Sequence, residues 1–315
     1  MSDRPRVLVY SRHSADRFRD WLAEHDAPAA LMVASTPEEA DAVIAEVEVI
    51  LGWKVPPTIF ARAPRLRWIQ SMGAGVDDLM TAKDLPEQVT VTRIVDQFGS
   101  PIAEYVFAEL LARVRELGRL RELQRERRWE HFIAGTLAGR HLGVAGLGSI
   151  GAEIVRKARA FDMLVSGLSR SPTQAGLVDR HFGPAGWSDF VRDLDVLVLT
   201  LPLTEATRGV VNASVLGAMR PNSVLVNVGR GALIDETALI AALRAGRPGR
   251  AILDVFIHEP LPAESPLWTM PGVTVTPHVS GPSTDVGVGT FFLENLQRYV
   301  SGEPLRGVVN RELGY

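Results

Sequence analysis

The second half of the chain repeats one pattern, in which a short apolar run is followed by a segment of helix length. The runs are HLGVA, MLVSGLS, DVLVLTLP, SVLVNVG, RAILDV and VTVTPH, all between residues 141 and 278. Strands that alternate with helices build parallel sheets with helices on both faces. The pattern therefore predicts a doubly wound α/β domain with six strands.

The N-terminal part of the chain shows the same alternation. Strands are predicted in RVLVYS at 6–11, around Val47–Leu51, in RLRWIQSMGAGVD at 65–77 and in VTVTRI at 89–94. We therefore expect two Rossmann-like doubly wound parallel-sheet domains, with the active site in the cleft between them. The expected boundaries are 1–99 with 281–315 for one domain and 100–280 for the other.

One long helix is predicted over 101–130. Ser100 can cap it, and Pro101 fits its first turn. Its second half is dense in Arg and Glu, which suits either a solvated face with i,i+4 pairs or a linker helix that leads into a subunit contact. If the chain forms a homodimer, the candidate surface is 101–140, with Trp129 and Phe132.

Composition excludes several classes of function. The formal net charge of −3 gives a nucleic-acid partner no electrostatic support. The absence of cysteine rules out disulfides and thiolate metal sites, and we expect no metal. No apolar run reaches the roughly 20 residues of a membrane span, and the first residues lack the apolar core of a signal peptide. A cytoplasmic protein without a membrane partner is expected.

The stretch GLGSIG at 146–151 follows HLGVA and opens a helix-like segment. In a dinucleotide fingerprint the first glycine makes a tight turn, the second lets the backbone approach the pyrophosphate, and the third lets helix and strand pack closely. The helix that follows aims its N-terminal amides at phosphate. An ordinary structural turn is the alternative. The predicted cofactor contacts are Gly146, Gly148, Ser149, Ile150 and Gly151, which makes 100–280 the dinucleotide-binding domain and the other the substrate-binding domain.

The ribose end of such a site usually carries an acid about 20 residues after the fingerprint. Here the chain has Ser169, Arg170 and Ser171 instead. Arg170 can pair with a 2′-phosphate, and both serine hydroxyls can donate hydrogen bonds to it. NADP is therefore predicted as the preferred cofactor over NAD. In the alternative, Arg170 stacks on adenine or faces solvent.

Three polar residues follow later strands, where doubly wound sheets bind ligands. Arg230 follows SVLVNVG, Glu259 lies in DVFIHEPLP, and His278 follows VTVTP. A structural Arg230–Glu259 pair and an ordinary loop histidine are the alternatives. Together the three suit reduction of a 2-keto acid, which needs a cation for the carboxylate and carbonyl and an acid for the nascent alkoxide. Glu259 beside His278 would favour the imidazolium form that carries the proton.

With these motifs the sequence resembles the D-isomer-specific 2-hydroxyacid dehydrogenase family, most strongly from about 95 to 282. The segment LPLTEATRGVVNASVLGAMRPNSVLVNVGRGALIDETAL at 201–239 is similar to the family's central signature, and DVFIHEPLP and TPHVSG match the segments with its catalytic Glu and His. The resemblance implies Arg230 for substrate binding, His278 as acid and base, Glu259 as its partner, and Asp254 on the nicotinamide carboxamide. The cofactor-lining residues implied are Leu201, Pro202, Thr207, Val228, Gly229 and Gly281.

The resemblance also implies substrate contacts in the N-terminal domain, where backbone amides of SMGAGVD would bind the substrate carboxylate. Gly73, Ala74 and Gly75 allow close backbone approach, and Met72 precedes them. A plain strand-to-helix turn is the alternative. Trp53 follows a predicted strand and either walls the substrate pocket or lies in the core.

The chain looks most like the glyoxylate/hydroxypyruvate reductase branch of this family. The substrate stays open, because Pro282, Ser283 and Thr284 replace a bulkier or distinct residue that many members carry there. The implied activity is an NAD(P)-dependent reductase of a small 2-keto acid, and such enzymes are usually homodimers. The alternatives are phosphoglycerate or phosphite oxidation on the same scaffold, or a non-catalytic protein that senses a dinucleotide.

Overall fold

The computed structural model describes residues 4–315. Its contacts divide the chain into two compact units, Met1–Gln97 with Ser283–Tyr315, and Phe98–Pro282. The two crossings each lie two residues from the boundaries expected at 99/100 and 280/281. Both units are built around an all-parallel sheet, so the predicted fold class of two doubly wound parallel-sheet domains is confirmed.

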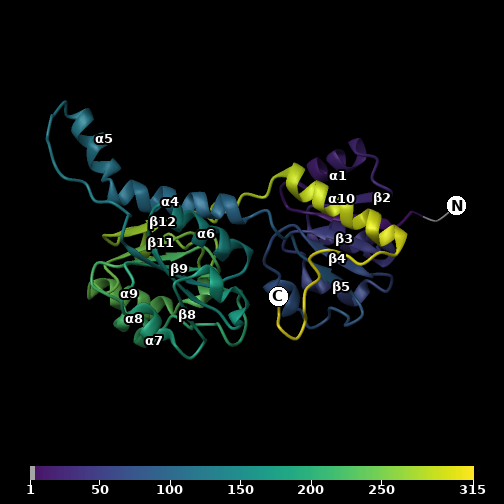
Figure 1. Ribbon diagram of the computed structural model, residues 1–315. Coiled ribbons are helices and arrows are strands. Elements are labelled where there is room, and N and C mark those ends of the chain that lie inside the picture. The colour runs from purple at the N-terminus through teal and green to yellow at the C-terminus, as the bar shows by residue number, and fades with distance from the viewer. Residues whose placement is uncertain (1–3) are drawn as a thin grey trace. The chain divides into compact units, whose positions relative to one another are not determined.

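The first unit has a five-stranded sheet in the order β2-β1-β3-β4-β5 (Figure 1). Its strands are β1 (Arg6–Tyr10), β2 (Ala30–Ala34), β3 (Val49–Gly52), β4 (Trp68–Ser71) and β5 (Thr90–Thr92). The winding reverses between β1 and β3, so ligands are expected where these two strands end. The sequence did not predict β2. This edge strand is only partly buried and begins and ends with alanine, a weak strand former.

Helices cover both faces of this sheet. They are α1 (Ala15–Glu24), α2 (Pro37–Val43), α3 (Asp77–Met80) and α10 (Asp285–Ser301), with short 3-10 turns η1 (Ile44–Glu46) and η2 (Pro57–Arg62). On one face, Phe292 of α10 stacks on Trp68 of β4 with ring centroids 5.2 Å apart. A Cβ on Gly289 would lie 2.4 Å from the Trp21 ring, so a glycine is needed for α10 to pack against α1.

The second unit has a seven-stranded sheet in the order β12-β11-β10-β9-β6-β7-β8. Its strands are β6 (His141–Ala145), β7 (Leu164–Leu168), β8 (Arg180–Phe182), β9 (Val196–Leu199), β10 (Val224–Asn227), β11 (Arg250–Leu253) and β12 (Val273–Val275). The winding reverses between β6 and β9, as in dinucleotide-binding domains. Six strands were predicted. The seventh, β8, is a three-residue edge strand with an exposed or half-buried sequence RHF, too short for a periodic signal.

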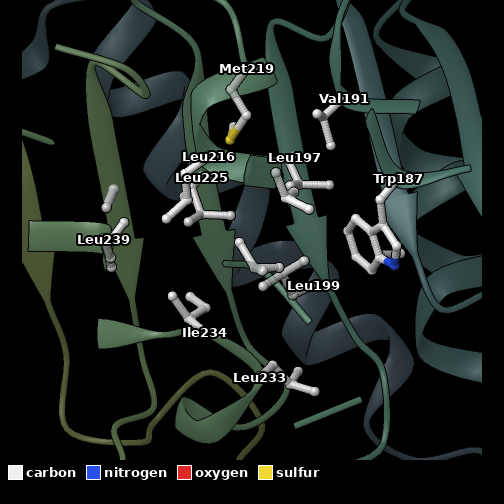
Figure 2. Close-up of a cluster of buried hydrophobic side chains, with 14 of the residues drawn as sticks. Trp187, Val191, Leu197, Leu199, Leu216, Met219, Leu225, Leu233, Ile234 and Leu239 are labelled. Carbon is white, nitrogen blue, oxygen red and sulfur yellow. The ribbon is translucent and has the colours of Figure 1, made fainter. Parts of the chain in front are cut away.

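The helices of the second unit are α4 (Gly99–Val114), α5 (Leu117–Arg125), α6 (Ser149–Ala160), α7 (Trp187–Val191), α8 (Ala213–Ala218) and α9 (Glu236–Arg244), with 3-10 turns η3 (Pro172–Leu177), η4 (Gly231–Leu233) and η5 (Pro266–Trp268). Figure 2 shows the core under one face of the sheet. Leu197 and Leu199 of β9 meet Leu225 of β10 there, with Trp187 of α7 and Leu216 of α8 packed against them. This core fixes the strand ends from which the candidate site is built.

The single helix predicted over 101–130 is wrong in three respects. The helix starts at Gly99, so Ser100 lies inside it and donates to Glu104 rather than capping it. Glu116 adopts a left-handed conformation, with φ 51°, and separates α4 from α5. Beyond Arg125 the helix does not continue. The segment α5 projects from the rest of this unit (Figure 1), because its Arg- and Glu-rich sequence has little apolar surface to bury against the sheet.

Candidate active site

The glycine loop lies between β6 and α6, and its shape depends on two of its glycines. Gly146 has φ +104°, and a Cβ there would lie 2.9 Å from the backbone of Thr200. A Cβ on Gly151 would lie 1.9 Å from the carbonyl oxygen of Gly146. A Cβ on Gly148, in contrast, would meet no atom of the described chain within 4 Å. The backbone is therefore open at Gly148, where the fingerprint requires a pyrophosphate to approach, and the loop fits a dinucleotide.

The N-terminus of α6 provides the anion-binding end of this loop. Gly148 is its N-cap residue, and no side chain caps the helix. The backbone amides of Ser149, Ile150 and Gly151 form its first turn, and amides in such a turn bind phosphate oxygens with help from the helix dipole. The hydroxyl of Thr200 donates to the carbonyl oxygen of Gly146 at 2.7 Å, which ties the end of β9 to the loop. The loop thus lies at the point where the winding reverses.

The residues implied as cofactor-lining after β9 and β10 lie side by side. A Cβ on Gly229 would lie 3.1 Å from the carbonyl oxygen of Leu201. The hydroxyl of Thr207 donates to the carbonyl oxygen of Pro202 at 2.7 Å, which folds the loop after β9 back on itself. The amide of Val228 donates to Leu199 at 3.3 Å. These residues continue the edge that begins at Gly146. Gly281 differs, because a Cβ there would contact Ile102 at 3.1 Å, which indicates packing against α4.

The loop after β7 carries Ser169, Arg170 and Ser171. Both serine hydroxyls already make hydrogen bonds within the chain. Ser169 Oγ lies 2.7 Å from the carbonyl oxygen of Ser171 and 2.8 Å from Nε2 of His181. Ser171 Oγ lies 2.6 Å from Thr173 Oγ1 and accepts the Thr173 amide at the start of η3. Arg170 is exposed. The loop is held in shape before any ligand binds.

Arg230, Glu259 and His278 follow β10, β11 and β12, so all three come from the carboxyl edge of one sheet. Gly231 lets two of these loops meet, because a Cβ there would lie 2.0 Å from the carbonyl carbon of Phe256. The side chain of Asn227 fixes the turn before Arg230 by accepting the Gly229 amide at 3.1 Å and donating to the Arg230 carbonyl at 2.9 Å. The arginine is therefore held from the buried end of β10.

Glu259 and His278 form a hydrogen-bonded pair. His278 Nδ1 lies 3.0 Å from Glu259 Oε2, and the other carboxylate oxygen accepts the Phe256 amide at 3.1 Å. A carboxylate oxygen accepts, so Nδ1 carries the hydrogen of this bond. The second ring nitrogen, Nε2, is left to exchange a proton with a substrate. The pair has the arrangement of a histidine acid/base with an orienting carboxylate.

The backbone of His278 is held in an uncommon conformation, with φ 55°. Asp254, fully buried, holds the segment that contains it. One carboxylate oxygen accepts hydrogen bonds from the Thr276 hydroxyl at 2.6 Å and from the Val279 amide at 2.9 Å. The other accepts a hydrogen bond from the Ser280 amide at 2.9 Å. Asp254 is thus an anchor of the histidine loop. Its contact with a nicotinamide carboxamide stays a prediction.

Tyr105 of α4 extends this network. Its hydroxyl lies 2.7 Å from Thr276 Oγ1. Because the single Thr276 proton points to Asp254, the tyrosine donates to the threonine oxygen. Burial raises the pKa of Tyr105 to about 12, so the hydroxyl stays protonated at neutral pH. The hydrogen bonds therefore run in one direction, from tyrosine to threonine to carboxylate.

In the first unit, Trp53 follows β3 and packs on the SMGAG turn. A Cβ on Gly73 would lie 2.3 Å from the Trp53 ring. Ser71 Oγ accepts the Gly73 amide at 3.2 Å and donates to the Gly75 carbonyl at 3.3 Å, so the turn is closed from inside. Within residues 4–315, the amides of Ala74 and Gly75 make no hydrogen bond to the chain. Met72 is buried, so it supports the turn through the core.

Three residues of the site escaped the sequence interpretation. His181 lies on the unpredicted strand β8, Thr200 directly follows β9, and Tyr105 lies on a helix to which the sequence gave other roles. Only Thr200 gave a signal, as a polar residue directly after an apolar run. Across residues 4–315, no cluster of three or more His, Asp or Glu could hold a metal, and no helix is long and apolar enough to span a membrane.

Comparisons with known proteins show the family to which the chain belongs. Residues 107–280 match the family model described as the D-isomer specific 2-hydroxyacid dehydrogenase, NAD binding domain. A glyoxylate/hydroxypyruvate reductase A of Photorhabdus laumondii is 34% identical over 270 residues, which cover 84% of this chain and 86% of that protein. The chain belongs to the D-isomer specific 2-hydroxyacid dehydrogenase family, whose members are NAD(P)-dependent oxidoreductases, so the predicted family is confirmed.

Two solved structures are also similar. One is an NADPH-dependent glyoxylate/hydroxypyruvate reductase of Sinorhizobium meliloti in complex with NADP and sulfate, with a TM-score of 0.88 at 32% identity, covering 99% of this chain and 100% of that one. The other is a D-isomer specific 2-hydroxyacid dehydrogenase of Xanthobacter autotrophicus in complex with NADPH and MES. Its TM-score is 0.86 at 34% identity, with 99% of each chain covered.

Proposed function

We propose that the chain is an NADPH-preferring reductase of small 2-keto acids, in the glyoxylate/hydroxypyruvate reductase branch of its family. The observation that carries the proposal is the Glu259–His278 bond beside the Arg230 loop, on the same sheet edge as the open glycine loop. The names of the similar reductases and their NADP complexes support the substrate class and the cofactor. None of the relatives named above is a phosphoglycerate or phosphite dehydrogenase.

Each candidate site residue has a separate role in this reaction. The bound cofactor supplies the hydride that reduces the keto carbon. Arg230 offers a planar pair of donors to the substrate carboxylate and carbonyl oxygen. His278 delivers the proton from Nε2 to the alkoxide oxygen, while Glu259 stabilises the imidazolium and holds the ring. The amides of Ala74 and Gly75 are assigned to the substrate carboxylate.

A turnover assay tests this function. The wild-type chain is assayed with NADPH and NADH against glyoxylate, hydroxypyruvate, pyruvate and bulkier 2-keto acids. His278→Ala should lower kcat by about 10²- to 10⁴-fold, and Arg230→Ala should lower kcat/KM through both binding and orientation. His25→Ala, at an exposed position at the end of α1, is the control. Wild-type rates in both site variants would refute the assignment, and cofactor binding without turnover would favour a sensor.

We also propose that the chain is a homodimer through α5 and the segment that follows it. Trp129 is 100% exposed and Ile133 is 91% exposed, which is unusual for large apolar side chains on a monomer surface. Arg119 stacks over the Phe132 ring at 4.1 Å, so the returning segment keeps a defined shape beside the helix. Light scattering of the wild type should give twice the monomer mass, and light scattering of Trp129→Arg should give the monomer mass. A monomeric wild type would reject the proposal.

We propose a cytoplasmic location for the chain, since it has no cysteine.

A further inference from the structure

The segment that carries His278 has a backbone conformation that needs support. His278 has φ 55°, in the left-handed region that residues other than glycine seldom adopt. Such a conformation persists only where the surrounding structure fixes it. The carbonyl oxygen of Asp254 accepts the His278 amide at 2.9 Å. Its carboxylate accepts the amides of the next two residues, Val279 and Ser280. One fully buried residue therefore fixes the backbone at His278 and directly after it.

The bond from Thr276 to Asp254 depends on the direction of one proton. The Thr276 hydroxyl lies 2.6 Å from the carboxylate, but a hydroxyl can rotate and donate elsewhere. Tyr105 restricts this rotation. Its hydroxyl lies 2.7 Å from Thr276 Oγ1 and donates to it, which leaves the threonine proton to Asp254. A hydroxyl that accepts one hydrogen bond also donates the next one more strongly. Tyr105 thus strengthens the support that Thr276 gives to Asp254.

Helix α4 contacts the β12 segment at two threonines. Tyr105 bonds to Thr276, which directly follows β12, and about two turns further along the helix Arg113 donates to Oγ1 of Thr274 at 2.9 Å. Both threonines are half-buried. Among residues 4–315, only the Thr276 contact leads on to the buried carboxylate. The two contacts therefore hold the same helix on the same strand, but only one of them supports the histidine segment.

We propose that Tyr105 and Thr276 are positioning residues that hold His278, through Asp254, where its Nε2 can deliver a proton to the substrate. This inference rests on the proposed reductase function. Neither Tyr105 nor Thr276 is assigned a contact with substrate or cofactor. Loss of either side chain should slow the chemical step more than it weakens substrate binding, because the groups assigned to the substrate carboxylate lie on other loops.

Single-turnover oxidation of NADPH in a stopped-flow instrument tests the inference, with the 2-keto acid that the wild type reduces fastest. Tyr105→Phe keeps the ring and should lower the single-turnover rate about tenfold, with KM for the keto acid changed by less than about twofold. Thr276→Val should lower the rate about a hundredfold. Thr276→Ser keeps the hydroxyl and should react within about threefold of the wild type.

A double variant tests whether the tyrosine acts through the threonine. In the Thr276→Val background, Tyr105→Phe should lower the single-turnover rate further by less than about twofold, because the bond to be lost is already absent. An additional tenfold decrease there would show that Tyr105 acts by another route, and would overturn the inference.

Thr274→Val is the matched control, because it removes the other hydrogen bond between α4 and β12. It should lower Tm by about 2–4 °C, as Tyr105→Phe does, but react at the wild-type rate. The inference is overturned if Thr274→Val slows the reaction as much as Tyr105→Phe, if Tyr105→Phe reacts like the wild type, or if Thr276→Ser is as slow as Thr276→Val. If Thr276→Val does not fold, Tyr105→Phe against Thr274→Val decides alone. A wild type that reduces no 2-keto acid overturns the proposed function as well.

Discussion

Two glycines at the start of α6 allow cofactor binding to be separated from folding. Gly148→Ala places a methyl group where no atom of the described chain lies within 4 Å. The backbone there, with φ −72° and ψ −168°, is open to alanine. The free energy of unfolding should change by less than about 1 kcal/mol. The methyl group nevertheless enters the space assigned to the pyrophosphate, so NADPH affinity should fall at least about tenfold, or about 1.4 kcal/mol.

Gly151→Ala should act in the opposite way. Its Cβ would lie 1.9 Å from the Gly146 carbonyl oxygen, so α6 must move by roughly 1 Å or more to reach an ordinary contact. Overpacking of this kind costs about 1–3 kcal/mol. For a domain of this size each kcal/mol lowers Tm by about 2–4 °C, so a decrease of roughly 2–12 °C is expected.

Thermal unfolding followed by circular dichroism and titration of NADPH fluorescence measure the two effects on the same samples. Gly217→Ala in α8 is the control, because its Cβ also meets nothing within 4 Å. It should stabilise the chain by up to about 1 kcal/mol and leave NADPH binding unchanged. The reasoning is refuted if Gly148→Ala binds NADPH like the wild type, or if it unfolds as early as Gly151→Ala.

Three further changes probe the rest of the site. Gly231→Ala, whose Cβ would lie 2.0 Å from the Phe256 carbonyl carbon, should separate the Arg230 and Glu259 loops and lower kcat/KM about a hundredfold, with NADPH binding kept in a fluorescence titration. Gly73→Ala, 2.3 Å from the Trp53 ring, should raise KM for the keto acid about tenfold in steady-state assays. Tyr105→Phe should cost about 1 kcal/mol in urea unfolding at pH 8. The pKa of Tyr105 is raised to about 12 when folded, so the wild-type stability from this group is full below pH 10 and is lost as the pH rises towards 12. Tyr105→Phe should not show this decrease in stability between pH 10 and pH 12.

The sequence predicted the parts of the fold whose strands are buried on both faces. Strands such as β9 and β10 are continuous apolar runs, because helices cover both sides of a parallel sheet. Arg230 and Glu259 were found because each follows such a run, and His278 was found because it follows the alternating sequence VTV of the edge strand β12. The edge strand β8 was missed because its sequence RHF contains no apolar run, and β2 was missed because its sequence ALMVA begins and ends with alanine, a weak strand former.

Other features depend on geometry that spacing does not carry. The break at Glu116 lies within a sequence of strong helix formers, and only the left-handed backbone ends α4 there. The hydroxyl of Ser169 was expected to donate to a ligand. In the structure its proton points to the Ser171 carbonyl oxygen 2.7 Å away, and its oxygen accepts a hydrogen bond from Nε2 of His181 on β8, so the hydroxyl has no proton left for a ligand. The direction in which a serine hydroxyl donates depends on which acceptors lie near it in the folded chain, and the sequence does not show these.

The loops that carry the candidate residues of each unit share one means of support, which explains how irregular segments can hold side chains in place. Each loop is tied by a buried polar residue in or next to the strand end: Asn227 holds the Arg230 turn, Asp254 holds the His278 segment, and Ser71 closes the SMGAG turn. All three are at most 4% exposed. A buried polar group is costly unless it is hydrogen-bonded, and loop amides and carbonyls need partners that no neighbouring strand supplies. The buried side chain and the loop backbone supply hydrogen bonds to each other. A buried polar residue at the carboxyl end of a parallel strand therefore marks a loop whose conformation matters for function.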